Sequence, residues 1–219
     1  RHTTPFEMVE FKFHCKMPIF VARQWVRHRT ANINEYSLRY SEARDEFYYP
    51  EPGNIQFQSA LNKQGRSGEV PKVLKQKVLD YFKDISERSF SMYQELNEAG
   101  IARELARSIL PVNIYTEWYW KNDLHNLLHF IGLRSDNHAQ YEIRVFSDAM
   151  ASSVKLIAPH AWEAYQDYVV KGMRFSKIEK SLLEKNLPNR IIEDIVMDVV
   201  YQLTATLHLN KPREVKDLY

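Results

Sequence analysis

Cysteine and glycine are scarce in this sequence, and long hydrophobic runs are absent from it. The single cysteine, Cys15, excludes an internal disulfide and any cluster held by several cysteines, and it fits a reducing cytoplasm. Six glycines in 219 residues leave neither a Walker phosphate loop nor a Gly-x-Gly-x-x-Gly dinucleotide turn. No apolar run approaches the ~20 residues of a membrane span, and no signal peptide opens the sequence. We therefore expect a cytoplasmic protein without a membrane partner. Because Arg1 stands in place of Met, we also expect that the natural N-terminus is missing.

The charge balance and the aromatic content limit the classes of partner. The net charge is only +2, so global electrostatics does not favour a duplex-binding protein, and any basic patch must be local. Hydrophobic residues make up 44% of the sequence, which is enough to bury a core. Aromatic residues reach 13%, which can supply stacking surfaces as well as core. The composition is that of a globular protein whose function rests on a local site.

Hydrophobic periodicity predicts the secondary structure. Polarity alternates from Val9 to Met17, which predicts a half-buried strand with Cys15 pointing inward. Apolar residues at helical spacing predict a helix over 71–99, interpreted as a core helix without chemistry. The other predicted elements are a short helix over 19–26, a loop or hairpin over 50–71, a short helix over 101–110, a strand over 112–120, a helix capped by Asp123 that runs to about 131, a helix capped by Ser135 or Asp136 that runs to about 158, and a mostly helical tail over 160–219 with a break near Pro188 and an end near Pro212. Together they predict an α+β fold, a single helix-dominated domain over 1–219 with a central antiparallel or mixed sheet flanked by helices.

The most informative segment runs from Arg27 to Tyr40. With Arg23 it places four arginines within seventeen residues, interleaved with neutral hydrogen-bonding groups. A guanidinium forks onto phosphate or onto the carbonyl edge of a base and keeps its charge at any working pH. The segment therefore predicts a pocket for a planar anion such as a nucleotide, although a solvated basic turn is the commoner meaning of an isolated arginine-rich run. Ser37 lacks a legible His–Asp partner and a Gly-x-Ser-x-Gly elbow, so binding phosphate suits it better than nucleophilic attack.

His125 and His129 lie four positions apart, so they share one face of a predicted helix and raise the question of zinc. A zincin would place Glu after the first histidine, where Asn126 stands here, and a third ligand, His138 or Asp136, is not fixed by spacing. Polar contacts to a cofactor and ordinary surface histidines remain the alternatives.

Arg134 follows an apolar stretch and is expected to lie just before a helix N-terminus. In that setting a guanidinium can stabilise an anion that develops on a bound ring. A salt bridge to Asp136 or Glu142 is an equally good interpretation of Arg134 taken alone.

Arg27-His28-Arg29, seven further residues and then Ser37 match the Arg-His-Arg-x7-Ser signature of the flavin-dependent thymidylate synthases. The sequence resembles that family over about residues 1–158. The other segments that carry the resemblance are Thr4-Pro5-Phe6-Glu7, Ala22-Arg23-Gln24-Trp25, Asn34-Glu35, Arg39-Tyr40-Ser41, Arg107 with Leu110-Pro111, Leu133-Arg134-Ser135-Asp136 and His138-Ala139-Gln140.

The resemblance implies an enzyme of dTMP biosynthesis that methylates dUMP to dTMP. It implies 5,10-methylenetetrahydrofolate as the carbon donor and FAD, reduced by NADPH, as the hydride source, with FAD bound outside a Rossmann fold. It also implies a homotetramer whose active sites are assembled from several subunits, without a metal and without a nucleic acid partner.

The resemblance also implies roles for individual residues. Arg134 would hold the uracil edge and stabilise negative charge as the ring is activated, so that no protein nucleophile is needed. The implied dUMP ligands are Gln24, Trp25, Val26, Arg27, Glu35, Tyr36, Ser37, Leu38, Arg39, Arg107 and Arg134. The implied FAD ligands are Thr4, Arg27, His28, Arg29, Glu35, Asp123, Leu124, His125 and His129, with His2 near the flavin and the folate.

Some positions depart from the family pattern. Thr3 and Met8 stand where some members carry Glu and His, and other members have Asn and Arg in place of Asp123 and His125. The loop at 60–70 and the helical tail over 172–219 lie outside the motifs, and neither is assigned a role.

Two alternative functions remain. A nucleic-acid-binding module, with arginines on phosphates and tyrosines stacked on bases, is the main alternative, and a zinc hydrolase built on His125 and His129 is a weaker one.

Overall fold

The computed structural model describes residues 2–60, 64–186 and 197–198. The chain divides into two compact units, Arg1–Gln166 and Asp167–Tyr219, and the first contains every predicted site residue. The π-helical turn η3 (Gln166–Val170) leads into the second unit, which contains α8 (Lys177–Asn186). The helix break predicted near Pro188 and the end near Pro212 lie outside the described residues. The prediction of a single domain over the whole chain stays a prediction.

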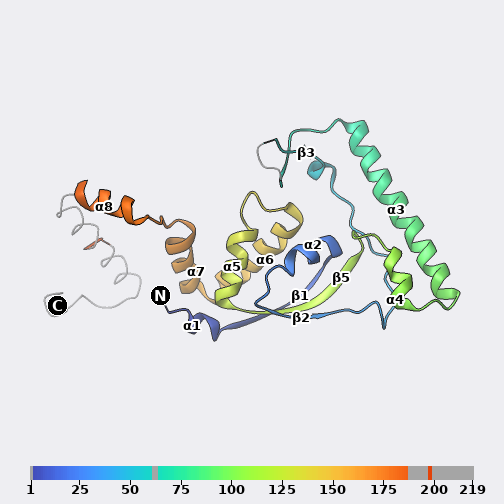
Figure 1. Ribbon diagram of the computed structural model, residues 1–219, viewed down its shortest axis with the longest axis horizontal. Coiled ribbons are helices and arrows are strands. Elements are labelled where there is room, and N and C mark those ends of the chain that lie inside the picture. The colour runs from blue at the N-terminus through green and yellow to red at the C-terminus, as the bar shows by residue number, and fades with distance from the viewer. Residues whose placement is uncertain (1, 61–63, 187–196, 199–219) are drawn as a thin grey trace. The chain divides into compact units, whose positions relative to one another are not determined.

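An antiparallel sheet of three strands forms the centre of the first unit (Figure 1). Its order is β1 (Glu10–Pro18), β5 (Tyr115–Asp123) and β2 (Asn32–Glu35), with Cys15 opposite Trp118 and Asn34 opposite Tyr119. The α+β prediction is confirmed, and β1 lies within one residue of its predicted position.

The other two strands differ from the sequence prediction. β5 was predicted over 112–120 but begins at Tyr115, because a turn precedes it in which Ile114 N donates to Pro111 O at 3.1 Å. It then continues to Asp123, opposite Glu10. β2 was not predicted, because it is only four residues long, all four are exposed, and only one of them is apolar.

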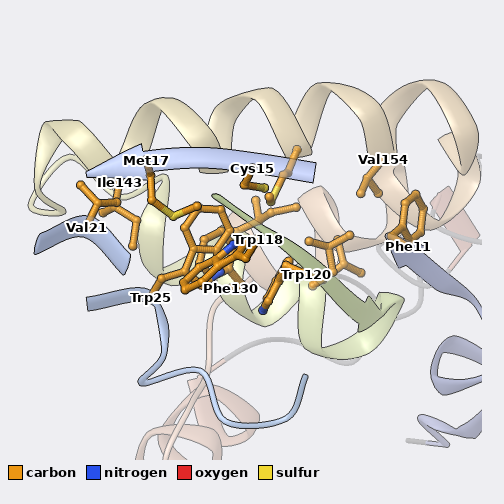
Figure 2. Packing of buried hydrophobic residues seen from close by; sticks show 14 of the residues in the cluster. Phe11, Cys15, Met17, Val21, Trp25, Trp118, Trp120, Phe130, Ile143 and Val154 are labelled. Carbon is orange, nitrogen blue, oxygen red and sulfur yellow. The ribbon is translucent and has the colours of Figure 1, made fainter. Parts of the chain in front are cut away.

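The hydrophobic core lies on one face of this sheet. Cys15, Trp118 and Trp120 point from the strands towards three helices, and Trp25 fills the space between them (Figure 2). Those helices are α2 (Ile19–Trp25), α5 (Leu124–Arg134) and α6 (Tyr141–Ile157). The inward orientation predicted for Cys15 is confirmed, and burial raises the pKa of its thiol to about 11, so the thiol stays protonated and is no nucleophile.

The remaining helices agree with the predicted periodicity in part. The predicted helix over 101–110 is two short pieces, α4 (Arg103–Ala106) and the 3-10 turn η2 (Arg107–Ile109). Two more short helices are α1 (Thr4–Glu7) and α7 (Pro159–Tyr165). In the described part of the chain, no helix is both long and apolar enough to cross a membrane.

The predicted loop or hairpin over 50–71 is confirmed as a hairpin. It contains the 3-10 turn η1 (Pro52–Asn54) and the paired strands β3 (Phe57–Gln58) and β4 (Arg66–Ser67). A half-buried ion pair attaches it to the rest of the unit: Arg66 Nη2 donates to Glu142 Oε2 at 2.6 Å, and Tyr48 Oη donates to Glu142 Oε1 at 2.7 Å.

The long helix α3 (Lys72–Glu98) was predicted with nearly its observed bounds, but its interpretation as a core helix is wrong. Its buried residues are Ser86, Ser89 and Tyr93, whereas Tyr81 is 62% exposed and Ile85 50% exposed. Apolar periodicity marks the face of a helix that avoids water, and it does not say whether the same chain covers that face.

Candidate functional site

The predicted site residues form two groups in the structure. The first, called the α5 group, consists of Gln24, His28, His129 and Arg134, which lie around α5 and the end of α2. The second, called the α4 group, consists of Glu35, Ser37, Arg39 and Arg107, which lie near α4 and the end of β2.

Arg134 is the centre of the α5 group. It is the last residue of α5, and its Nε donates to His28 Nε2 at 2.9 Å. The ring of His28 in turn packs edge-on against Phe130, with 4.8 Å between ring centroids. The signature histidine therefore fixes the position of the predicted ring-activating arginine.

The expected position of Arg134 before a helix N-terminus is wrong, because α6 begins only at Tyr141 and neither Ser135 nor Asp136 caps it. The Asp136 carboxylate instead accepts from His138 N at 2.7 Å, and a turn follows in which Ala139 N donates to Asp136 O at 2.9 Å. The charge of Arg134 thus lies at a helix C-terminus, where the helix dipole favours a cation.

The salt bridges considered for Arg134 do not form. Asp136 pairs with His138 at 2.8 Å, and Glu142 pairs with Arg66. Within the described residues, the Nη atoms of Arg134 donate no hydrogen bond to the protein, so both remain available to a ligand.

His28 is expected to stay neutral well below neutral pH. Burial, helped by the charges of Arg134 and His129, lowers the pKa of His28 from 6.5 to about 4. The neutral ring can then accept from Arg134 through Nε2 and carry its proton on Nδ1.

The measurement is a histidine NMR titration from pH 4 to pH 8, with His28 assigned through a His28→Gln variant. The His28 ring should keep its neutral shifts down to about pH 5. Because the unfolded chain takes up this proton near pH 6.5, the folded state should lose stability as the pH falls from there towards 4. The Arg134→Ala variant should raise the His28 pKa. A wild-type His28 that titrates near 6.5 would contradict this account.

One side-chain oxygen of the α5 group, Gln24 Oε1, accepts no hydrogen bond from any described residue. This oxygen is buried, and the lack of a partner is rare for a buried polar atom and typical of a position that binds a ligand. Trp25, predicted beside it as a dUMP contact, is wholly buried in the core, so only its backbone can reach a ligand. Val26 is 42% exposed.

The predicted flavin residues lie partly on α5 and partly on the segment before β2. Asp123 caps α5 as predicted, since its Oδ1 accepts from Asn126 N at 2.9 Å, and Leu124 is buried. The residues with exposed side chains are His2, Thr4, Arg27, Arg29, His125 and His129. In the described chain Arg27 and Arg29 form no ion pair, and no third His, Cys, Asp or Glu joins the two α5 histidines as a metal-binding group.

The α4 group combines Glu35 at the end of β2, Ser37 and Arg39 on the loop that follows, and Arg107 at the start of η2. Glu35 Oε1 accepts from Thr116 Oγ1 at 2.7 Å, and Ser37 Oγ accepts from Arg39 N at 3.3 Å. Arg39 Nη2 donates to Glu104 Oε2 at 3.0 Å. Glu104 precedes Arg107 by three residues in the sequence. Tyr36 is 39% exposed, and Leu38 is half-buried.

Sequence reasoning did not single out Glu104, nor the Arg103–Glu42 pair beside it. One signal could have drawn attention to Glu104. It lies three positions before Arg107, so the two residues share one face of the predicted helix.

The two groups lie apart within one chain. β2 runs antiparallel to β5, from opposite Lys121 to opposite Trp118, and Tyr36 N extends the pairing to Glu117 O at 2.8 Å. Figure 1 shows the chain continuing from β2 towards α4, away from α5.

Comparisons with known proteins identify the family. A family model described as thymidylate synthase complementing protein, Thy1, matches residues 1–160. The flavin-dependent thymidylate synthase of Rickettsia conorii is 52% identical over 189 residues, which cover 80% of this chain and 64% of that protein. The protein of the same name from Ruegeria pomeroyi is 45% identical over 221 residues, which cover 99% of this chain and 70% of that protein.

The fold agrees with a solved structure. The crystal structure of the UMP/dUMP methylase PolB from Streptomyces cacaoi, bound with 5-Br UMP, superposes with a TM-score of 0.71 at 32% identity and covers 75% of this chain and 76% of that chain. The chain spans less than two thirds of the length of the Rickettsia conorii relative. From the matched residues and the shared fold together, the chain belongs to the thymidylate synthase complementing family, that of the flavin-dependent thymidylate synthases.

Proposed function

We propose that this chain is a flavin-dependent thymidylate synthase that methylates dUMP to dTMP. The observation that carries the proposal is the hydrogen bond between Arg134 and His28, because it joins the predicted ring-activating arginine to the family signature. Relatives of the same name and a UMP/dUMP methylase of the same fold support it.

In this proposal the α5 group receives the uracil ring. The unpaired, buried Gln24 Oε1 suits a ring N–H, and the free Nη atoms of Arg134 suit a ring carbonyl. As C5 becomes nucleophilic, negative charge spreads onto that carbonyl oxygen, and a half-buried guanidinium stabilises this charge better than water does. A protein nucleophile is not required, and Cys15 is too deeply buried to act as one.

The exposed donors of the first unit fit FAD. Arg27 and Arg29 form no ion pair with any described residue, so their charges suit a pyrophosphate, and His125 and His129 offer ring nitrogens on one face of α5. Bound FAD, reduced by NADPH, would supply the two electrons that turn the carbon from 5,10-methylenetetrahydrofolate into a methyl group. The proposal also includes NADPH as the reductant and the folate as the carbon donor, with His2 near the flavin and the folate.

The α4 group would bind the nucleotide phosphate through Ser37, Arg39 and Arg107. Because it lies apart from the α5 group in one chain, we infer that each site takes the two groups from different subunits. This supports the proposed homotetramer, since closed symmetric assemblies place such a site at every equivalent interface.

The proposed function predicts a yellow protein whose flavin absorbance is bleached by NADPH without oxygen. The measurement is anaerobic bleaching with and without dUMP, followed by an assay for dTMP after methylenetetrahydrofolate is added. dTMP formation is the expected result. A colourless preparation that takes up no added FAD would contradict the proposal.

A nucleic-acid-binding module, the alternative function, finds no support in the comparisons. It predicts oligonucleotide binding with a steep salt dependence and no affinity for a mononucleotide.

The cytoplasmic location of the protein remains a prediction.

A further inference from the structure

Arg39 differs from the other arginines proposed to bind the nucleotide, because a carboxylate already occupies it. Its guanidinium lies 3.0 Å from Glu104 Oε2, and the two side chains are 55% and 59% exposed. In the described chain, Arg27, Arg107 and Arg134 form no ion pair with Asp or Glu. Arg39 thus enters the site with its charge balanced by Glu104, a residue of α4.

The contact between Arg39 and Glu104 is not needed to hold this loop against α4. Arg103, the neighbour of Glu104, donates from Nη1 to Tyr40 O at 3.0 Å and from Nη2 to Glu42 Oε1 at 3.0 Å. The loop is also fixed by Ala43 N, which donates to Tyr93 Oη at 2.9 Å. Glu104 can therefore leave Arg39 while the loop keeps its place.

We infer that Glu104 competes with the nucleotide phosphate for Arg39 and so sets the affinity of the site for phosphate-bearing nucleotides. An exposed ion pair is weak, so a phosphate dianion can displace the carboxylate, which then remains nearby as a like charge. Substrate and product carry the same phosphate, so Glu104 weakens both equally and speeds the release of dTMP. The inference rests on the proposed function, because that function assigns the phosphate to Arg39.

The test is the Glu104→Gln variant, which keeps the shape of the side chain and removes its charge. Calorimetric titration of the FAD-loaded protein should show that the Kd of dUMP and that of dTMP both fall about two- to fivefold. The affinity for 2′-deoxyuridine, which lacks the phosphate, should not change. An unchanged or raised Kd for dUMP in Glu104→Gln would overturn the inference and leave Glu104 as a structural residue of α4.

The matched control is Glu42→Gln, which removes the carboxylate of the neighbouring ion pair and leaves Arg39 alone. It should not tighten dUMP binding; equal tightening in both variants would mean that general charge, not competition at Arg39, sets the affinity. Wild-type binding of dUMP tests the proposed function separately. If the wild type binds no dUMP, that function fails, and titration with inorganic phosphate still decides whether Glu104→Gln frees an anion site.

Discussion

Replacement of Arg134 by alanine is expected to lower the rate of dTMP formation by about 10²- to 10³-fold while the protein keeps its bound FAD. The guanidinium is the proposed stabiliser of charge on the uracil ring, and the half-buried position of Arg134 shields that charge from water. Its bond to His28 fixes its direction, so a mobile cation from solution cannot take its place. The measurement is the single-turnover rate of dTMP formation, with the flavin absorbance recorded on the same samples.

Two further variants separate chemistry from folding. Arg134→Lys keeps the charge but loses the planar fork, so its rate should lie between those of alanine and wild type. Arg144→Ala removes an arginine on neighbouring α6 that donates to Asn137 O at 3.3 Å and should leave the rate near that of wild type. Equal loss of FAD and of dTMP formation in Arg134→Ala would show that Arg134 is structural.

Replacement of Trp25 by alanine is expected to lower the free energy of unfolding by about 3–5 kcal/mol. Its ring stacks on Phe130 with 4.9 Å between centroids and meets Trp118 and Trp120 edge-on at 5.6 and 5.4 Å. Truncation therefore leaves a cavity where α2, α5 and the sheet meet, and these aromatic neighbours are too rigid to fill it. The measurement is urea unfolding at a fixed protein concentration.

The Trp25 result can be compared with two matched changes. Trp25→Phe should cost less, because it keeps most of the stacked ring and removes an Nε1 that is buried without a partner. Tyr119→Ala removes a half-exposed aromatic side chain from the opposite face of the sheet and should cost about 1 kcal/mol or less. A Trp25→Ala protein as stable as wild type would mean that the core is not where the structure places it.

Local signals in the sequence were sufficient to predict β1 and α5. The alternation of polarity fixed β1, and Asp123 marked the start of α5 through the hydrogen bond that it now accepts from Asn126 N. Alternation of polarity and a capping side chain each involve only a few neighbouring residues, so both can be recognised from one short segment of the sequence.

Contacts between distant segments could not be predicted in the same way. β2 is a strand only because β5 pairs with it, and nothing in its own four residues requires that structure. Arg134 and His28 are 106 positions apart, so their hydrogen bond follows from the way α2 and α5 pack. Ser135 and Asp136, which are good capping residues, were wrongly predicted to start α6, because the Asp136 carboxylate accepts from His138 N in a turn that comes before the helix.

The most direct test of the account is subunit complementation, because the central claim is that one site takes its α4 group and its α5 group from different chains. Arg107→Ala and Arg134→Ala should each be inactive alone. When the two variants are co-expressed, random assembly gives about a quarter of the sites an intact copy of both groups, and dTMP formation should return to about that fraction of the wild-type rate. Mixed assemblies as inactive as the single variants would show that both groups must come from one chain, and would contradict the account.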